Sequence, residues 1–323
     1  MDARYFIGID GGGTKTEAVL INGNGHILGR QIETSSNPND IGLESSVDLL
    51  LSVSNRLIRE NGLDASEVNL FGGISGVINH RDAMIGMIKK RSAFLNMDIQ
   101  SDGINLISSE LGECDGAAII CGTGSACFLR IGRELIRIGG WGYLLDSAGS
   151  GYDIGRQAIE AVLRAHDGRG KPTLLTDLIS ESLGAPAELS ITKLYSEGKP
   201  LIASLAPLVF RADEAGDDAA HTILARNAAA LAEYIGAAWR RLCTTGRQPD
   251  RMPVVIGGGI AVHYGTRWLD MISPFVDASV HADIRIACNP VIWGPLVEAV
   301  RLNQSHADLD MMKQSFLREY RLL

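Results

Sequence analysis

The residues Asp10-Gly11-Gly12-Gly13-Thr14-Lys15-Thr16 form the stretch that decides the fold. They stand between two apolar runs, residues 5–9 and 18–21, each as long as a short strand. Two strand-like runs joined by glycines predict a β-hairpin. A hairpin turn needs only one or two glycines, whereas this one also has an aspartate before it and a Thr-Lys pair after it. Because backbone N–H groups left bare by glycine bind anions, we predict that this turn holds a phosphate group.

The composition of the 323-residue chain excludes several classes of protein. Hydrophobic residues make up 46% and charged residues 21%, which is an ordinary globular balance. The formal net charge is −8 and no basic run exceeds Lys89-Lys90-Arg91, so we expect neither nucleic acid nor a membrane as partner. The five cysteines form no CxxC pair and no signal peptide precedes the first strand. We therefore predict a cytoplasmic protein with free thiols.

The opening motif is repeated about 110 residues later, the offset that a duplicated fold would give. A strand-like run at residues 116–121 leads into Gly122-Thr123-Gly124-Ser125, and a second run follows at residues 126–130. Duplication predicts one phosphate-binding turn in each half of the chain. Coincidence between two glycine hairpins is the alternative. A third glycine turn, Gly257-Gly258-Gly259, ends a strand at residues 253–256 and leads into a helix.

Periodicity predicts the remaining elements. Apolar residues on one face predict a helix over residues 47–58, and the stretch 173–245 is predicted to be mostly helical. Residues 104–107 are predicted to form a short strand that ends in Ser108-Ser109-Glu110. Two further helices are predicted, from about residue 292 and over residues 309–320.

Two common nucleotide motifs are missing from the sequence. It contains no GxxxxGK[ST], which excludes a P-loop enzyme, and no GxGxxG followed by an acidic residue, which argues against a dinucleotide fold. A nucleotide held between two lobes is the interpretation that remains.

The three glycine turns, in this order and spacing, resemble the phosphate-1, phosphate-2 and adenosine segments of the actin-like sugar-kinase superfamily. Gly139-Gly140-Trp141-Gly142 and Gly149-Ser150-Gly151-Tyr152 narrow the resemblance to the BadF/BadG/BcrA/BcrD ATPase family, and within it to the N-acetylglucosamine kinases. The resemblance implies an α/β fold of two actin-like (ribonuclease H-like) lobes with a nucleotide cleft between them. The first lobe would span residues 1–115, and the second, with a helical insertion, residues 116–290. The helices of residues 291–323 would follow, the first of them returning to the first lobe.

The resemblance also implies ATP and Mg²⁺ as cofactors and a role for each matching position. Asp10 would hold Mg²⁺. The phosphates would lie against two sets of residues, Gly11, Gly12, Gly13, Thr14 and Lys15 in one lobe and Gly122, Thr123, Gly124 and Ser125 in the other. Adenosine would lie against Gly257, Gly258 and Gly259. The sugar pocket would be lined by Asn37, Ser75, Gly140, Trp141 and Asp146. For Lys15, the exposed edge of the hairpin is an equally good explanation.

Phosphoryl transfer to a hydroxyl needs a carboxylate that accepts the proton. In the family this base is an aspartate at the end of the strand before the second phosphate turn. With a strand at residues 104–107, Glu110 is the candidate base, and the alternative is that Glu110 merely begins a helix. Ser147 and Ala148 follow Asp146 where relatives carry a second acid, which predicts a changed acceptor or weakened activity.

The function predicted in this way is ATP-dependent phosphorylation of an amino sugar on a hydroxyl. N-acetylglucosamine comes first, and N-acetylmuramic acid or glucosamine next. A homodimer is implied by the resemblance alone. Two alternatives remain, an ATPase activator of a radical or dehydratase enzyme and a catalytically weak sugar-binding relative.

Overall fold

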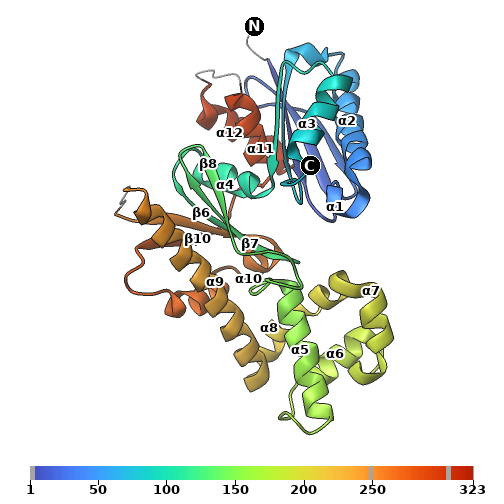
Figure 1. The fold of residues 1–323 in the computed structure, drawn as a ribbon, viewed down its shortest axis with the longest axis vertical. Coiled ribbons are helices and arrows are strands. Elements are labelled where there is room, and N and C mark those ends of the chain that lie inside the picture. Colours follow the sequence, from blue (N-terminus) through green and yellow to red (C-terminus); the bar gives the residue numbers. More distant parts are fainter. Residues whose placement is uncertain (1–3, 247–249, 303–306, 323) are drawn as a thin grey trace. The chain divides into compact units, whose positions relative to one another are not determined.

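The computed structural model describes residues 4–246, 250–302 and 307–322. The chain divides into two compact units (Figure 1). Unit 1 consists of the chain up to Cys114 together with the chain from Cys288 onward, and unit 2 is Asp115–Ala287. Among the described residues, no helix combines the length and apolar character needed to cross a bilayer.

Unit 1 is built on a five-stranded mixed sheet of order β3-β2-β1-β4-β5. The first three strands are antiparallel, and β4 and β5 continue the sheet in parallel with β1. The strands are β1 (Tyr5–Gly11), β2 (Thr16–Asn22), β3 (Ile27–Glu33), β4 (Val68–Ile74) and β5 (Asn96–Ser101). The helices are α1 (Pro38–Ile41), α2 (Leu43–Glu60), α3 (Arg81–Arg91), α4 (Gly103–Leu111), α11 (Trp293–Arg301) and α12 (Leu309–Tyr320), with a 3-10 turn η1 (Ala65–Glu67).

Unit 2 is built on a second five-stranded mixed sheet, of order β10-β9-β6-β7-β8. Its strands are β6 (Gly116–Cys121), β7 (Ser125–Ile131), β8 (Glu134–Ile138), β9 (Met252–Gly257) and β10 (Ala282–Ile286). Its helices are α5 (Gly151–His166), α6 (Leu175–Leu183), α7 (Ile191–Ser204), α8 (Ala206–Glu214), α9 (Asp218–Thr244) and α10 (Gly259–Ile272), with 3-10 turns η2 (Ala187–Leu189) and η3 (Ser273–Phe275).

The two sheets have the same topology. In each, the first strand pairs antiparallel with the second and the second with the third, while the fourth strand runs parallel to the first and the fifth parallel to the fourth. The strand order of unit 2 therefore repeats that of unit 1, which confirms the duplication predicted from the two glycine hairpins. The helices α5 to α9 lie between the third and fourth strands of unit 2, and they confirm the predicted helical stretch.

Alternation along β1 gives unit 1 its two covered faces. Ile7 and Ile9 are fully buried in a core shared with α2 and α3. Gly8 points to the opposite face, where a Cβ would lie 2.7 Å from the backbone nitrogen of Leu296, so α11 can pack directly on the strand (Figure 1). The amphipathic face of α2, predicted from the sequence, is buried as expected.

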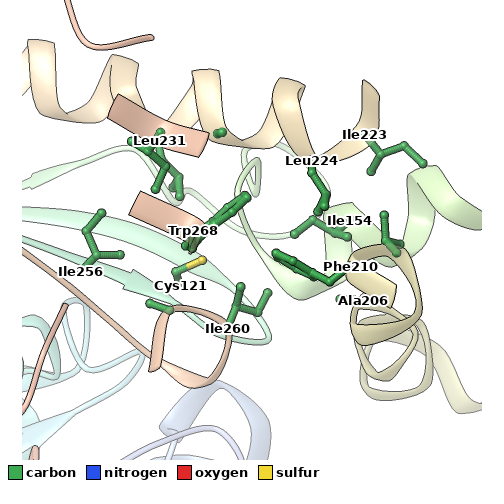
Figure 2. Close-up of a cluster of buried hydrophobic side chains, with 14 of the residues drawn as sticks. Cys121, Ile154, Ala206, Phe210, Ile223, Leu224, Leu231, Ile256, Ile260 and Trp268 are labelled. Atoms are coloured by element: carbon green, nitrogen blue, oxygen red, sulfur yellow. The ribbon is translucent and has the colours of Figure 1, made fainter. Parts of the chain in front are cut away.

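The core of unit 2 joins its sheet to the long helix α9 and to α10. Figure 2 shows Trp268 of α10 with Leu231 of α9 on one side and Cys121 of β6 on the other. All three side chains belong to one buried hydrophobic cluster, and burial raises the pKa of the Cys121 thiol to about 12. Cys121 is thus a small residue of the hydrophobic core.

The strand predicted over residues 104–107 is wrong, because these residues form the middle of helix α4. The strand of this region is β5, which ends at Ser101. The physical reason is that residues 103–109 are all buried, so this part of the helix has no exposed face to mark its periodicity. A short apolar run of this kind looks the same in sequence whether it is a buried strand or a buried helix.

Candidate active site

The first glycine turn is the predicted hairpin, with Gly11 paired to Thr16 across β1 and β2. The Gly12 N–H donates to the Lys15 carbonyl at 2.9 Å and closes the turn. Gly11 serves packing, since a Cβ there would lie 2.3 Å from the Ser36 Oγ. Residues 13 to 15 are exposed. The turn is therefore open to solvent where the predicted phosphate would bind.

Lys15, at the edge of this turn, donates to the Glu17 carboxylate at 3.2 Å. Glu17 is almost wholly buried and also accepts hydrogen bonds from Arg30 at 2.8 Å and from the Tyr320 hydroxyl at 2.8 Å. The lysine thus has a place at the hairpin edge that requires no ligand, and both interpretations of it remain open.

Asp10 is the second-last residue of β1, followed by Gly11 and the turn, and its carboxylate is supported by helix α4. The Asn105 Nδ2 donates to Asp10 Oδ1 at 2.7 Å and to the Gly73 carbonyl at 2.9 Å. Burial raises the pKa of Asp10 to about 6, and the nearby charges of Asp102 and Glu17 act in the same direction. A partly desolvated carboxylate of this kind is suited to bind a cation, whose charge would offset the burial.

Asp102 follows β5 directly and lies at the first residue before α4. It is near enough to Asp10 for its charge to raise the pKa of that carboxyl. Mg²⁺ sites in phosphoryl-transfer enzymes use one or two carboxylates, and Asp10 and Asp102 provide two. Asp102 is not among the site residues predicted from the sequence. The signal that could have found it is its position after a strand, which was hidden because the strand was predicted a few residues too late.

Glu110 lies at the other end of α4, and its carboxylate accepts hydrogen bonds from the backbone. Its Oε1 accepts the N–H groups of Cys288 and Asn289, both at 2.6 Å. Asn289 also donates through Nδ2 to the Ser109 carbonyl at 2.9 Å. Glu110 therefore holds the chain where it re-enters unit 1, which is a structural role.

Asn37 and Ser75 meet beside the first turn. The Ser75 N–H donates to the Gly11 carbonyl at 2.7 Å. Asn37 caps α1 by accepting the Asn39 N–H at 2.9 Å, and its Oδ1 lies 2.1 Å from where a Cβ on Gly76 would stand. Unit 1 thus brings the predicted sugar residues Asn37 and Ser75 together with the predicted phosphate turn.

The second glycine turn joins β6 to β7, with Cys121 paired to Ser125. The first turn of α5 is bound to it, since Gly151 N–H donates to the Gly122 carbonyl at 2.8 Å and Tyr152 N–H to the Thr123 carbonyl at 3.2 Å. The Ser125 hydroxyl donates to the Ala148 carbonyl at 2.7 Å. Thr123 is exposed, whereas the Ser125 side chain is occupied in holding the following loop.

The third glycine turn lies next to the second. Gly258 has a φ of 95°, and a Cβ there would lie 2.5 Å from the Cys121 carbonyl oxygen. The nitrogen of Gly259 lies 3.8 Å from the Cβ position of Gly122. Because β6 and β9 pair in parallel up to Ile120 and Gly257, both turns leave the same edge of the sheet. Unit 2 therefore brings the predicted phosphate and adenosine residues together.

The loop after β8 carries the other predicted sugar residues. Gly139, Gly140 and Gly142 have φ values of 65°, 67° and 113°, which only glycine adopts easily. Trp141 is 63% exposed, and the Arg137 guanidinium lies 5.0 Å from its ring centroid. The Arg137 Nη2 also donates to the Gly140 carbonyl.

Asp146 is oriented by a residue that the sequence did not reveal. Its Oδ1 accepts the Tyr234 hydroxyl of α9 at 3.1 Å. Burial, with the Asp146 charge, raises the pKa of Tyr234 to about 12, so the hydroxyl remains a donor. Ser147 is buried and donates to the Tyr143 carbonyl at 3.3 Å. The serine therefore stabilises the loop instead of facing solvent as a second acid would.

Comparison with known proteins shows the family of the chain. The model of the BadF/BadG/BcrA/BcrD ATPase family matches residues 7–292. The chain belongs to this family. It is 31% identical over 277 residues to the N-acetyl-D-glucosamine kinase of Dictyostelium discoideum, which covers 80% of this chain and 86% of that protein. It is 33% identical over 233 residues to the N-acetylmuramic acid/N-acetylglucosamine kinase of Clostridium acetobutylicum, with 68% of this chain and 74% of that protein covered.

Among solved structures, a provisionally assigned N-acetylglucosamine kinase from Chromobacterium violaceum has a TM-score of 0.72 and 25% identity, covering 94% of this chain and 99% of that one. As a member of this ATPase family, the chain has the expected α/β fold of two actin-like units. The predictions of family and fold class are confirmed.

Proposed function

We propose that this family member is an ATP-dependent amino-sugar kinase that phosphorylates a hydroxyl of N-acetylglucosamine or a close relative. The observation that carries the proposal is the group at the end of β1, where the open turn of residues 12–15 follows Asp10 and Gly11, with Asp102 nearby. The two relatives named as N-acetylglucosamine kinases support the choice of sugar.

The reaction would move one phosphoryl group. The hydroxyl oxygen of the sugar forms a bond to the γ-phosphorus of ATP, the bond to the β-phosphate oxygen breaks, and ADP leaves. The hydroxyl proton passes to a carboxylate. Mg²⁺, when bound, would supply charge neutralisation on the phosphates, and Asp10, with its raised pKa and fixed orientation, is the residue that would hold it.

We assign the base to Asp102 instead of Glu110. The family base follows the strand that comes before the hairpin of the second phosphate turn, and that strand is β5, which ends at Ser101. Glu110 stands eight positions further along a helix and accepts two backbone N–H groups at 2.6 Å. This carboxylate is already engaged by the backbone N–H groups of residues 288 and 289, so its position is explained by a structural role.

In unit 1, the proposed sugar-binding residues are Asn37 and Ser75. In unit 2, considered by itself, they are residues 140–146. Exposed Trp141 offers an apolar surface for an N-acyl group, and Asp146 offers an acceptor for sugar hydroxyls. The adenine nucleotide would lie on the turns at 122–125 and 257–259. A homodimer and a cytoplasmic location complete the proposal.

The test is a kinase assay over a panel of sugars. Purified protein is incubated with Mg-ATP and N-acetylglucosamine, N-acetylmuramic acid, glucosamine or glucose, and the phosphosugar and ADP are measured together by ³¹P NMR. We expect equal amounts of ADP and one amino-sugar phosphate, and loss of both with EDTA. If a sugar binds but no phosphosugar forms, the protein is a sugar-binding relative and not a kinase. ADP release independent of sugar would favour the ATPase activator.

A further inference from the structure

Helix α7 is interrupted at a Gly-Lys-Pro sequence. Gly198 has φ 60° and ψ −141°, far from helical values, and Pro200 follows two residues later. Proline cannot donate the helical hydrogen bond and disfavours helical geometry in the residue before it, which is Lys199. The chain therefore departs from helical geometry directly before Lys199.

The second half of α7 is fixed against α5 by contacts that leave no room for side chains. A Cβ on Gly155 would lie 1.9 Å from the Ile202 carbonyl oxygen. A Cβ on Gly151 would lie 3.2 Å from the Gly122 oxygen and 3.3 Å from the Ala203 oxygen. Since Gly151 itself donates to Gly122, the end of α7, the start of α5 and the turn at 122–124 form one packed assembly within unit 2.

The Lys199 ammonium lies over the second glycine turn. Its Nζ is 3.6 Å from the position of a Cβ on Gly124 and 5.7 Å from the centroid of the Tyr143 ring. Among the ion pairs between described residues, none involves Lys199, and its neighbours there are an aromatic ring and a glycine backbone. Gly124 has no side chain that would separate the ammonium from a ligand on the turn.

We propose that Lys199 binds the polyphosphate of a nucleoside triphosphate held on the turn at residues 122–124. This inference rests on the proposed function, which places the nucleotide on that turn. Lysine is a compact point charge suited to phosphate oxygens, and a flexible stem lets it follow them. The Tyr143 ring would hold the ammonium in place by a cation–π contact until the phosphates arrive. In a chain of net charge −8, this is a local positive charge beside a bare turn.

A purely structural role is the alternative. In that case Lys199 would only anchor Tyr143 and, through it, the loop that carries Asp146. The two roles differ in the ligand they affect, since the first acts on nucleotide phosphates and the second on the sugar and on the stability of the loop.

The experiment measures binding of ATP, ADP and adenosine by calorimetry to the full-length protein and to K199M, K199R and K171M. Lys171 is exposed in the same unit and is the matched control. We expect K199M to weaken the binding of ATP and of ADP at least tenfold. The affinity for adenosine and the KM for sugar should not change. K199R should recover most of the loss, K171M should match the wild type, and the K199M effect should shrink at high salt because it is electrostatic.

Three results would overturn the inference. The first is wild-type affinity of K199M for ATP. The second is an equal loss for adenosine and ATP. The third is a lowered melting temperature and raised sugar KM, shared with Y143A, at normal ATP affinity. The assay needs no sugar turnover, so Lys199-dependent ATP binding in a protein that phosphorylates no sugar would refute the kinase proposal alone. If the wild type binds no nucleotide, both fail.

Discussion

The Asn105 Nδ2 of helix α4 donates to the Asp10 Oδ1 of strand β1 at 2.7 Å, and the same amide donates to the Gly73 carbonyl at 2.9 Å. Asn105 is fully buried. The amide is thus fixed by one strand and orients the carboxylate of another. In our proposal this contact sets the direction of the residue that would hold Mg²⁺.

Replacing Asn105 by leucine keeps most of the volume and removes both donated hydrogen bonds. We expect kcat to fall about 10- to 100-fold, because misplacing a catalytic group by about 1 Å costs roughly that much, and the Mg²⁺ concentration for half-maximal rate to rise. The sugar KM should change little. The control is N96L, which loses the 3.0 Å bond from Asn96 to Asn69 in the same unit. If both variants show the same kinetics, Asn105 has only a structural role.

Gly73→Ala should act through Asn105. A Cβ on Gly73 would lie 1.7 Å from the Asn105 Oδ1, so the side chain would have to leave its present position. We expect a loss of kcat similar to that of N105L, and little further loss when G73A is added to N105A, because the two changes break one contact. Gly86→Ala on α3, where nothing lies within 4 Å of the new Cβ, should leave kcat unchanged. Additive losses would show that Gly73 acts independently of Asn105.

Asp10→Asn should stabilise the protein in the absence of Mg²⁺ while it abolishes activity. The pKa of Asp10 rises from 3.8 to about 6 on folding, chiefly because the carboxylate is desolvated. A raised carboxyl pKa favours the fold fully below pH 3.8, and this contribution is lost as the pH rises through 6. At pH 8 the charge therefore costs about 2–3 kcal/mol, which the neutral amide avoids.

Urea unfolding with EDTA at pH 8 and pH 4 checks this expectation. The gain of D10N over the wild type should be present at pH 8 and nearly absent at pH 4. D283N, which changes an exposed carboxylate on β10, should be within about 0.5 kcal/mol of the wild type at both. An equal gain at the two pH values would mean that desolvation of the charge is not the cause.

One pair of variants distinguishes between the two candidate bases, Asp102 and Glu110. We expect D102N to lower kcat about 10²- to 10⁴-fold, the usual contribution of a general base, with little change in melting temperature. E110Q should keep its turnover but lose about 1–2 kcal/mol of stability, because Glu110 accepts two backbone hydrogen bonds as an anion. Turnover assays and thermal unfolding on both variants decide. The reverse pattern would restore Glu110 as the base.

Tyr234→Phe should raise the KM for sugar and leave the KM for ATP unchanged. The variant removes the hydroxyl that donates to Asp146 at 3.1 Å and keeps the ring that packs against Gly139. We expect the sugar KM to rise about 3- to 10-fold, corresponding to one lost hydrogen bond, at constant KM for ATP. Tyr195→Phe, at an exposed position of α7, is the control. An effect on ATP alone would place Asp146 outside the sugar site.

The sequence predicted those parts of the fold whose signal is local. The hairpin at Asp10–Thr16 was identifiable because glycines stood between two apolar runs, and its repetition at 122–125 indicated the duplicated sheet. Helix α4 was missed because burial of every residue from 103 to 109 removed the exposed face that marks a helix. Because the strand ends at Ser101, the acidic residue that follows it is Asp102 and not Glu110.

The supporting contacts of the candidate site could not be predicted from the sequence. Asn105 and Asp10 are 95 positions apart, and Tyr234 and Asp146 are 88 apart. No periodicity links such pairs, since each depends on how two separate elements pack. The position of Lys199 could not be predicted either. A lysine between glycine and proline looks like an ordinary loop residue in the sequence, and its place depends on how α7 packs on α5. The roles assigned to these residues remain predictions for the experiments above.

The discontinuous course of unit 1 has a consequence for synthesis on the ribosome. Helix α11 packs on β1 at Gly8 and on α4, where a Cβ on Gly294 would lie 1.9 Å from the Asn105 carbonyl oxygen. All of unit 2 is translated before α11 emerges, so the N-terminal segment waits with one face of its sheet uncovered. Nascent chains from which unit 2 has emerged but α11 has not would expose that apolar face of the N-terminal sheet, a surface of the kind that makes folding intermediates prone to aggregate.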